Sequence, residues 1–126
     1  MKRLWIGILI LSALLASGCL IREALMKIHT PIAADLQHSA AAALTEDWNT
    51  ALDLAQHAAV RWERFHHFTA AVADHTPMDE VDGLFAELKI YASQRENPHF
   101  SATCRRLSAL AEAIAESHRL SWWNLL

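Results

Sequence analysis

The histidines are the residues of this chain that most invite a catalytic or metal-binding interpretation, since there are eight in 126 residues. The best local arrangement is His75 and Asp79, which stand four positions apart and would share one face of a helix. Zinc needs three or four nitrogen, sulfur or oxygen ligands at about 2.0–2.3 Å. A third ligand would have to come from elsewhere, and His66 and His118 are the candidates. A metal-binding or hydrolytic role around His75 and Asp79 is therefore one hypothesis.

The same residues have a structural interpretation, which we favour. Asp79 would be a cap or a first-turn acid stabilised by the amino end of the third helix, and His75 a hydrogen-bonded hinge residue before Pro77. The adjacent His66 and His67 would point about 100° apart on a helix. The chain also has no HExxH motif, no CxxC motif and no Gly-rich phosphate loop. We therefore expect no enzymatic activity, no cofactor and no bound metal.

Nucleophilic side chains give no better candidate. Cys104 falls on the inward stripe of a predicted helix, where a buried thiol is inert, and no histidine is placed by local spacing to activate it. Ser101, Ser117 and Ser121 lack the sharp-turn motif that exposes a catalytic serine. Covalent catalysis is therefore not expected.

The composition predicts a small all-α protein. A chain of 126 residues builds one domain with, at most, one targeting element. Hydrophobic residues make up 53%, with only 3 Gly and 3 Pro, which argues against disorder and against a fold rich in strands and turns. Setting aside Lys2 and Arg3 leaves nine basic against fourteen acidic residues, a net charge of −5. That balance repels phosphate backbones, so nucleic acid is not an expected partner.

Residues 4–21, LWIGILILSALLASGCLI, contain no charge. A helix over this stretch would reach about 27 Å, near the lower limit for crossing a bilayer core. Lys2 and Arg3 precede it, and the positive-inside rule then holds the amino end in the cytoplasm and places the rest of the chain outside. The stretch is expected to be a membrane anchor.

Two other interpretations of this stretch compete with a membrane anchor, namely a cleaved signal peptide and a buried core helix. The basic start, apolar middle and small residues also fit a cleaved signal peptide. In particular, Ala16-Ser17-Gly18-Cys19 resembles the bacterial lipobox, in which the cysteine is diacylated and the chain is cut before it, although Ala16 stands where that motif prefers Leu. Alternatively, Cys19 is an ordinary apolar residue of a spanning helix. A buried core helix is disfavoured, because so small a domain could not wrap it on all sides.

The remainder predicts about four helices arranged as two antiparallel hairpins. Thr30-Pro31 supplies an N-cap and a first-turn proline for a helix reaching about Leu44, and Asp47 caps the next helix after a turn of about three residues. A third helix follows Pro77, and a fourth runs from about residue 98 to 116. Apolar residues at helical spacing predict the buried faces. They are Ile32, Leu36, Ala40 and Ala43; Trp48, Ala51, Leu52, Ala55, Ala58, Ala59, Trp62 and Phe65; Val81, Leu84, Phe85, Leu88 and Tyr91; and Phe100, Cys104, Leu107, Ala111 and Ile114.

These elements divide the chain into three parts. Residues 1–21 are the anchor or lipoprotein-type signal, residues 22–30 a juxtamembrane connector, and residues 31–126 an extracytoplasmic helical domain. The chain ends SWWNLL, and Trp122-Trp123 would form an exposed apolar patch if left in water. We expect this tail to dock on the bundle, with the lipid headgroup level or a partner as alternatives.

One segment resembles part of a known repeat. Residues 47–52, with Ala55 and Ala58, resemble the turn and second helix of a tetratricopeptide repeat. We interpret the likeness as shared packing of a helical hairpin and not as membership, because the preceding helix departs from the repeat. Where the repeat has Trp, Leu and Tyr, this chain has Asp35, His38 and Ala42.

A second resemblance covers nearly the whole chain. It is carried by the start MKRLWI, the segment DWNTALDLA, Trp62, His75 followed by Asp79 and Val81, and the ending Asn124-Leu125-Leu126. In this order they resemble the bacterial family catalogued as domain of unknown function 4363. The resemblance implies a short, N-terminally anchored, all-helical protein. No catalytic residue can be carried over from it, because the family has none established.

The sequence thus predicts an antiparallel four-helix bundle held outside the cytoplasmic membrane by one N-terminal segment. The leading hypothesis for function is a non-enzymatic envelope component whose partners are the membrane and another protein. The metal-binding or hydrolytic role around His75 and Asp79 is the alternative.

Overall fold

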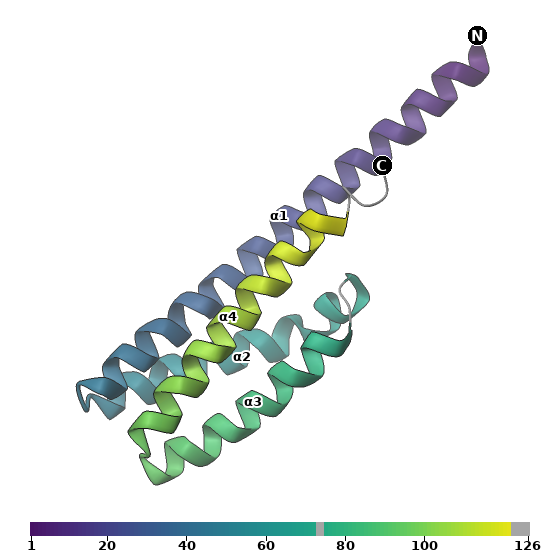
Figure 1. Cartoon of the computed structure of the whole chain (residues 1–126). Coiled ribbons are helices and arrows are strands. Elements are labelled where there is room, and N and C mark those ends of the chain that lie inside the picture. The colour runs from purple at the N-terminus through teal and green to yellow at the C-terminus, as the bar shows by residue number, and fades with distance from the viewer. Residues whose placement is uncertain (73–74, 122–126) are drawn as a thin grey trace.

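A computed structural model describes the backbone of residues 1–72 and 75–121 and the side chains of residues 1–71 and 77–116. Within these residues the chain forms four helices and no strand. The helices are α1 (Lys2–Leu44), α2 (Trp48–Val72), α3 (His75–Gln94) and α4 (Asn97–Ser121). The predicted all-α bundle of two hairpins is confirmed, and Figure 1 shows the amino-terminal half of α1 projecting well beyond the other helices.

Helix α1 is the central element of the bundle. It packs most extensively against α4 and α2, α3 packs on α4, and α2 and α3 touch each other over only a few residues. Figure 1 shows α1 and α4 running side by side, with α2 and α3 flanking them. The pair formed by α2 and α3 is therefore the weakest of the main helix contacts.

The predicted helix start at Thr30-Pro31 is wrong, because α1 continues through Pro31 without interruption over 43 residues. Its length is about 65 Å at 1.5 Å per residue. An interior proline removes one backbone hydrogen bond and costs about 3 kcal/mol. Leu25, Ile32 and Leu36 are each almost fully buried on one face of α1. Burying each such side chain contributes about 1.5–3 kcal/mol, so packing on both sides of Pro31 outweighs the local penalty.

The turns within both hairpins are built in the same way. Glu46 (φ 60°) and Arg95 (φ 50°) adopt the left-handed conformation just after α1 and α3. In the first turn the Asp47 amide donates to the Ala42 carbonyl at 2.9 Å, which closes the helix end. The Asp47 carboxylate then accepts a hydrogen bond from the Thr50 amide at 3.3 Å, so the predicted cap of α2 is confirmed.

The predicted buried faces are confirmed for all four helices. The core contains every residue expected from α1 and α4, and the same holds for the centres of α2 and α3. A few predicted core residues lie at its edge and are only partly buried, namely Trp48, Leu52, Ala59, Phe65 and Tyr91. These edge residues are mostly large side chains near helix ends or on the outer margins of the stripes.

Polar contacts fasten the end of the bundle that holds the two hairpin turns, which we call the distal end. The Ser39 hydroxyl donates to the Ala51 carbonyl at 2.6 Å, and the side-chain amide of Asn97 donates to the Ala43 carbonyl. The Ser101 hydroxyl donates to the Asn97 side-chain oxygen at 3.0 Å. The distal end is thus tied together by neutral hydrogen bonds from α1, α2 and α4.

Candidate functional site

The apolar stretch of α1 is exposed along its length. Every residue from Met1 to Leu20 is exposed except Gly18, and the exposed fractions of Trp5 and Leu9 are 70% and 71%. Among the described residues, α1 is the one helix long and apolar enough to cross a membrane, a test that a signal sequence also passes. A core helix would be covered by the bundle, whereas only 6% of this apolar window of α1 is buried. By its length and composition, the stretch fits a membrane anchor or a signal sequence.

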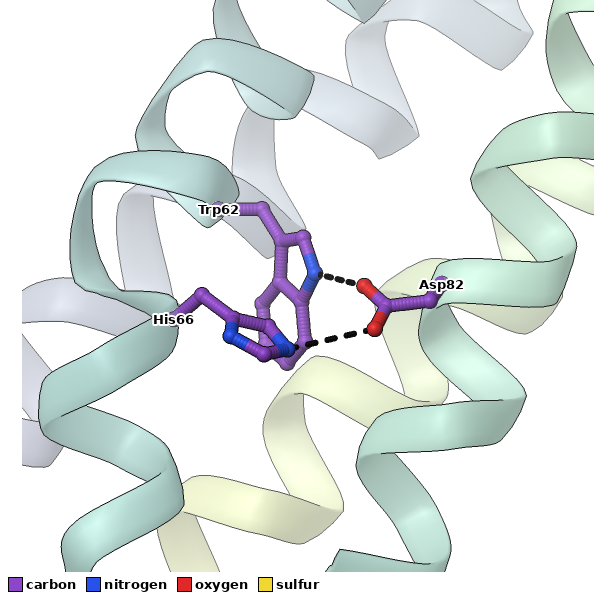
Figure 2. A network of polar contacts seen from close by, with 3 residues as sticks. All are labelled: Trp62, His66 and Asp82. Atoms are coloured by element: carbon purple, nitrogen blue, oxygen red, sulfur yellow. Dashed lines mark hydrogen bonds and ion pairs between the residues drawn. The ribbon is translucent and has the colours of Figure 1, made fainter.

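The most connected polar cluster of side chains joins α2 to α3. Figure 2 shows the Asp82 carboxylate of α3 facing Trp62 and His66 of α2, with one oxygen directed to each ring. The Trp62 indole N–H donates to Oδ1 at 2.6 Å, and His66 Nε2 lies 3.2 Å from Oδ2. Trp62 is buried, whereas His66 and Asp82 are partly exposed. This cluster bridges two helices that have few other contacts with each other.

The pairing of His66 with Asp82 supplies only part of what a hydrolytic site needs. A carboxylate can orient an imidazole for proton transfer, but a hydrolytic site also needs a nucleophile or an activated water. Among the residues whose side chains are described, no three His, Cys, Asp or Glu groups come together in a way that could hold a metal ion. The geometry of the described side chains therefore supports a structural bridge between α2 and α3.

The predicted site residues are distributed differently from the expectation. His66 contacts the carboxylate of Asp82 and not that of Asp79, which is exposed on α3. The expected place of Asp79 in the first turn is wrong, because α3 begins at His75 and has no acid in that turn. His75 is consequently a residue of the helix and not of a hinge before it. The side chains of His75 and His118 lie outside the described residues, as does the Trp122-Trp123 tail.

His29 of α1 is fully buried and also contacts the Trp62 ring. Its ring centroid lies 5.8 Å from that of Trp62, and its Nε2 lies 3.4 Å from the Thr69 hydroxyl of α2. Its Nδ1 has no hydrogen-bond partner among the described residues. Burial lowers the pKa of His29 from 6.5 to about 4, so the ring is neutral at pH 7.

The two cysteines differ in environment. Cys19 is exposed on the apolar stretch of α1, and Cys104 is buried in the core, 3.8 Å from the Ser39 hydroxyl. Burial raises the pKa of the Cys104 thiol to about 11, against the smaller opposing effect of the Ser39 hydrogen bond. The thiol therefore stays protonated at neutral pH and is a poor nucleophile. The predicted inward position of Cys104 is confirmed.

Comparison with protein families gives one match. A family model described as Domain of unknown function (DUF4363) matches residues 20–125. The chain belongs to this family. The DUF4363 match starts near the end of the apolar stretch and includes all of the helical bundle. It confirms the resemblance drawn from the sequence motifs, and its description assigns no activity.

No curated protein and no solved structure matched this DUF4363 chain. The features that could carry a function must therefore be taken from its own geometry. Those features are the exposed apolar stretch and the cluster around Trp62.

The sequence of this DUF4363 protein did not identify His29 and Asp82 as possible functional residues. His29 lies one turn from Leu25 and Ile32 on the same buried face, but the wrongly predicted helix start at residue 30 separated it from that face. Asp82 lies next to the inward residue Val81, and nothing in its local spacing links it to His66. Extending the apolar period through Pro31 could have identified His29. No sequence signal could have identified the Asp82 contact.

Proposed function

We propose that this DUF4363 protein is a non-enzymatic component of the cell envelope, held in the cytoplasmic membrane by residues 4–21. Its helical bundle lies on the extracytoplasmic side and binds another protein. The observation that carries the proposal is the exposed apolar stretch, which is continuous with the central helix of the bundle. In water this surface would be unfavourable, whereas a bilayer accommodates it.

The proposed orientation of the chain in the membrane rests on the charged residues that flank the apolar stretch. Lys2 and Arg3 precede the apolar stretch and favour the cytoplasmic side, which leaves the bundle outside. The bundle itself is negatively charged, so it gains little from contact with an anionic membrane surface. These two features support a domain that stands off the membrane and contacts a protein.

Cysteine labelling tests the location. Cys19→Ala and Cys104→Ala give a chain without cysteine, into which Lys89→Cys on the exposed face of α3 is introduced. A membrane-impermeant maleimide should label this variant on intact cells. The matched control is a cysteine inserted between Met1 and Lys2, which should react only after the membrane is opened. The reverse pattern, or recovery of the chain in the soluble fraction, contradicts the proposal.

The mass of the mature protein with its native cysteines separates the modes of attachment. An intact mass supports a spanning anchor, and a diacylated chain starting at Cys19 supports a lipid anchor, as the lipobox-like motif requires. Cleavage without acylation would contradict anchoring altogether.

Site-specific photocrosslinking tests the protein partner. Ile90 and Phe68 are exposed apolar residues of α3 and α2, with 55% and 40% of their surfaces accessible. A photoreactive phenylalanine analogue at either position should yield a discrete adduct with a different protein in intact cells. The same analogue at the exposed polar position Asp53 is the control and should yield less adduct. Adducts only to lipid, or only to a second copy of this chain, would contradict the proposed partner.

A further inference from the structure

His29 is held in an environment that suits only its neutral ring. The side chain is fully buried and contacts the Trp62 ring, and among the described side chains the Thr69 hydroxyl is its only hydrogen-bond partner. A neutral imidazole has one N–H donor and one acceptor nitrogen. The Thr69 hydroxyl can either donate or accept, so it can pair with Nε2 in either tautomer of the neutral ring. An imidazolium has two N–H groups that must both donate, and one of them would have no acceptor. A buried charge with an unpaired donor is strongly unfavourable.

Among the described side chains, no carboxylate contacts His29 that could stabilise a positive charge on its ring. From α2, His66 lies on the Trp62 ring, and from α3 the Asp82 carboxylate is bound by the Trp62 N–H. The Trp62 indole therefore contacts both His29 and the Asp82 carboxylate. Farther along α1, Asp35 forms an ion pair with Arg61 of α2 at 3.5 Å.

The other described charged side chains of α1 and α4 are engaged elsewhere or face solvent. On α1, Lys27 pairs with Glu23 at the surface. The described carboxylates of α4, Glu112 and Glu116, are exposed, and Glu112 accepts a hydrogen bond from Gln37. Within the described side chains, none of these groups is a hydrogen-bond partner of His29.

We propose that protonation of His29 opens one end of the helical bundle. When the medium becomes acidic, one proton from solvent adds to the unprotonated ring nitrogen. The end of the bundle nearest the apolar stretch then opens between α1 and α2 and exposes Trp62, while the distal end stays packed. The inference concerns the bundle alone and does not depend on which side of a membrane it occupies.

The contacts explain why opening stays local. Trp62 links His29 of α1 to Asp82 of α3, so moving its ring disturbs all three helices at this end. Helices α2 and α3 have few other contacts with each other. The distal hydrogen bonds of Ser39, Asn97 and Ser101 contain no group that titrates between pH 4 and 7.

The sign of the pH dependence follows from the lowered pKa of His29. In the closed bundle the pKa of His29 is about 4, and in an opened bundle the pKa of the exposed ring returns to its ordinary value of 6.5. The closed form is therefore favoured fully above pH 6.5, loses that advantage as the pH falls, and has lost all of it below about pH 4. Over this range the ratio of open to closed molecules rises by roughly two to three powers of ten.

Fluorescence of the intact chain in detergent micelles tests the proposal. Trp62 is kept as the only tryptophan by Trp→Phe changes at positions 5, 48, 122 and 123. His66→Gln is added so that a charge on that neighbouring ring cannot quench the indole. Between pH 7 and 3.5 the Trp62 emission should shift to longer wavelength, and acrylamide quenching should increase several-fold. The midpoint is expected between pH 4 and 6.5. In the control chain, Trp48 at the distal end is the only tryptophan and should not change over this range.

His29 itself is tested by two replacements, since either could fold poorly alone. His29→Gln keeps a polar side chain that does not titrate, and His29→Phe fills the site with an apolar ring beside Trp62. In each folded variant the acid transition of Trp62 should disappear or move below pH 4. An unchanged transition in both variants would overturn the proposal, and so would a Trp48 signal that moves together with Trp62, because that result means global unfolding.

Discussion

Trp62→Ala is expected to lower the free energy of unfolding by about 3–5 kcal/mol, the range for truncating a large buried aromatic side chain. The ring is only 3% exposed and lies against His29 of α1 and Phe85 of α3. Its N–H is also the donor to Asp82. The variant therefore loses packing between α2 and two other helices, α1 and α3, and leaves a cavity where α2 and α3 meet. Urea denaturation in detergent micelles at pH 7, followed by far-ultraviolet circular dichroism, measures the change.

Two variants separate the contributions of the Trp62 ring. Trp62→Phe retains an aromatic ring and removes the hydrogen bond to a partly exposed carboxylate, so a smaller loss of about 0.5–1.5 kcal/mol is expected. Trp48→Ala truncates the half-buried tryptophan that packs edge-on against Phe100 and should also cost less than Trp62→Ala. If Trp62→Ala is as stable as either control, Trp62 does not have the central packing role assigned to it.

The double substitution Leu9→Arg with Leu11→Arg is expected to prevent stable membrane insertion. Both side chains are exposed in the middle of the apolar stretch. Each arginine near the centre of a spanning helix costs about 2.5–3.5 kcal/mol, and each leucine removed had contributed about 0.3–0.6 kcal/mol. Two such changes exceed the margin expected for a stretch of only 18 uncharged residues. Alkaline extraction of membranes should release the variant and leave the unaltered chain in the pellet.

The matched control for this substitution is Leu9→Ala with Leu11→Ala, which removes the same side chains without adding charge and should stay in the membrane. Circular dichroism of the bundle should be unchanged in both variants, since neither position belongs to the core. Retention of the double arginine variant in the alkaline pellet would show that the stretch does not hold the protein by burial in lipid.

Local sequence signals predicted most of the fold because they act within single helices. The spacing of Phe100, Cys104 and Leu107 identifies the buried face of α4 directly, and Asp47 marks the start of α2 through its side-chain cap. Pro31 misled the prediction for α1. A proline is locally unfavourable inside a helix, and only the tertiary burial of residues on both sides of it shows that the helix continues.

The candidate site was less predictable for a related reason. His75 and Asp79 attract attention because they are close in sequence, whereas the contact of His66 with Asp82 joins residues 16 positions apart on different helices. Such a contact depends on how α2 is rotated against α3. The periodicity of either helix fixes its inward face but not which residues at the margin meet.

The uninterrupted course of α1 from the apolar stretch into the bundle sets a fixed stand-off. Residues 22–44 rise about 35 Å along the helix axis, and no flexible tether in the described chain allows that height to adjust. If residues 4–21 lie in lipid as proposed, the turn at residues 45–47 is presented at one distance from the bilayer. A tilt of about 20° in the membrane would carry that turn sideways by about 12 Å. Changes in bilayer thickness that alter the tilt would thus be transmitted mechanically to the far tip of the molecule, where they decide which neighbours it can reach.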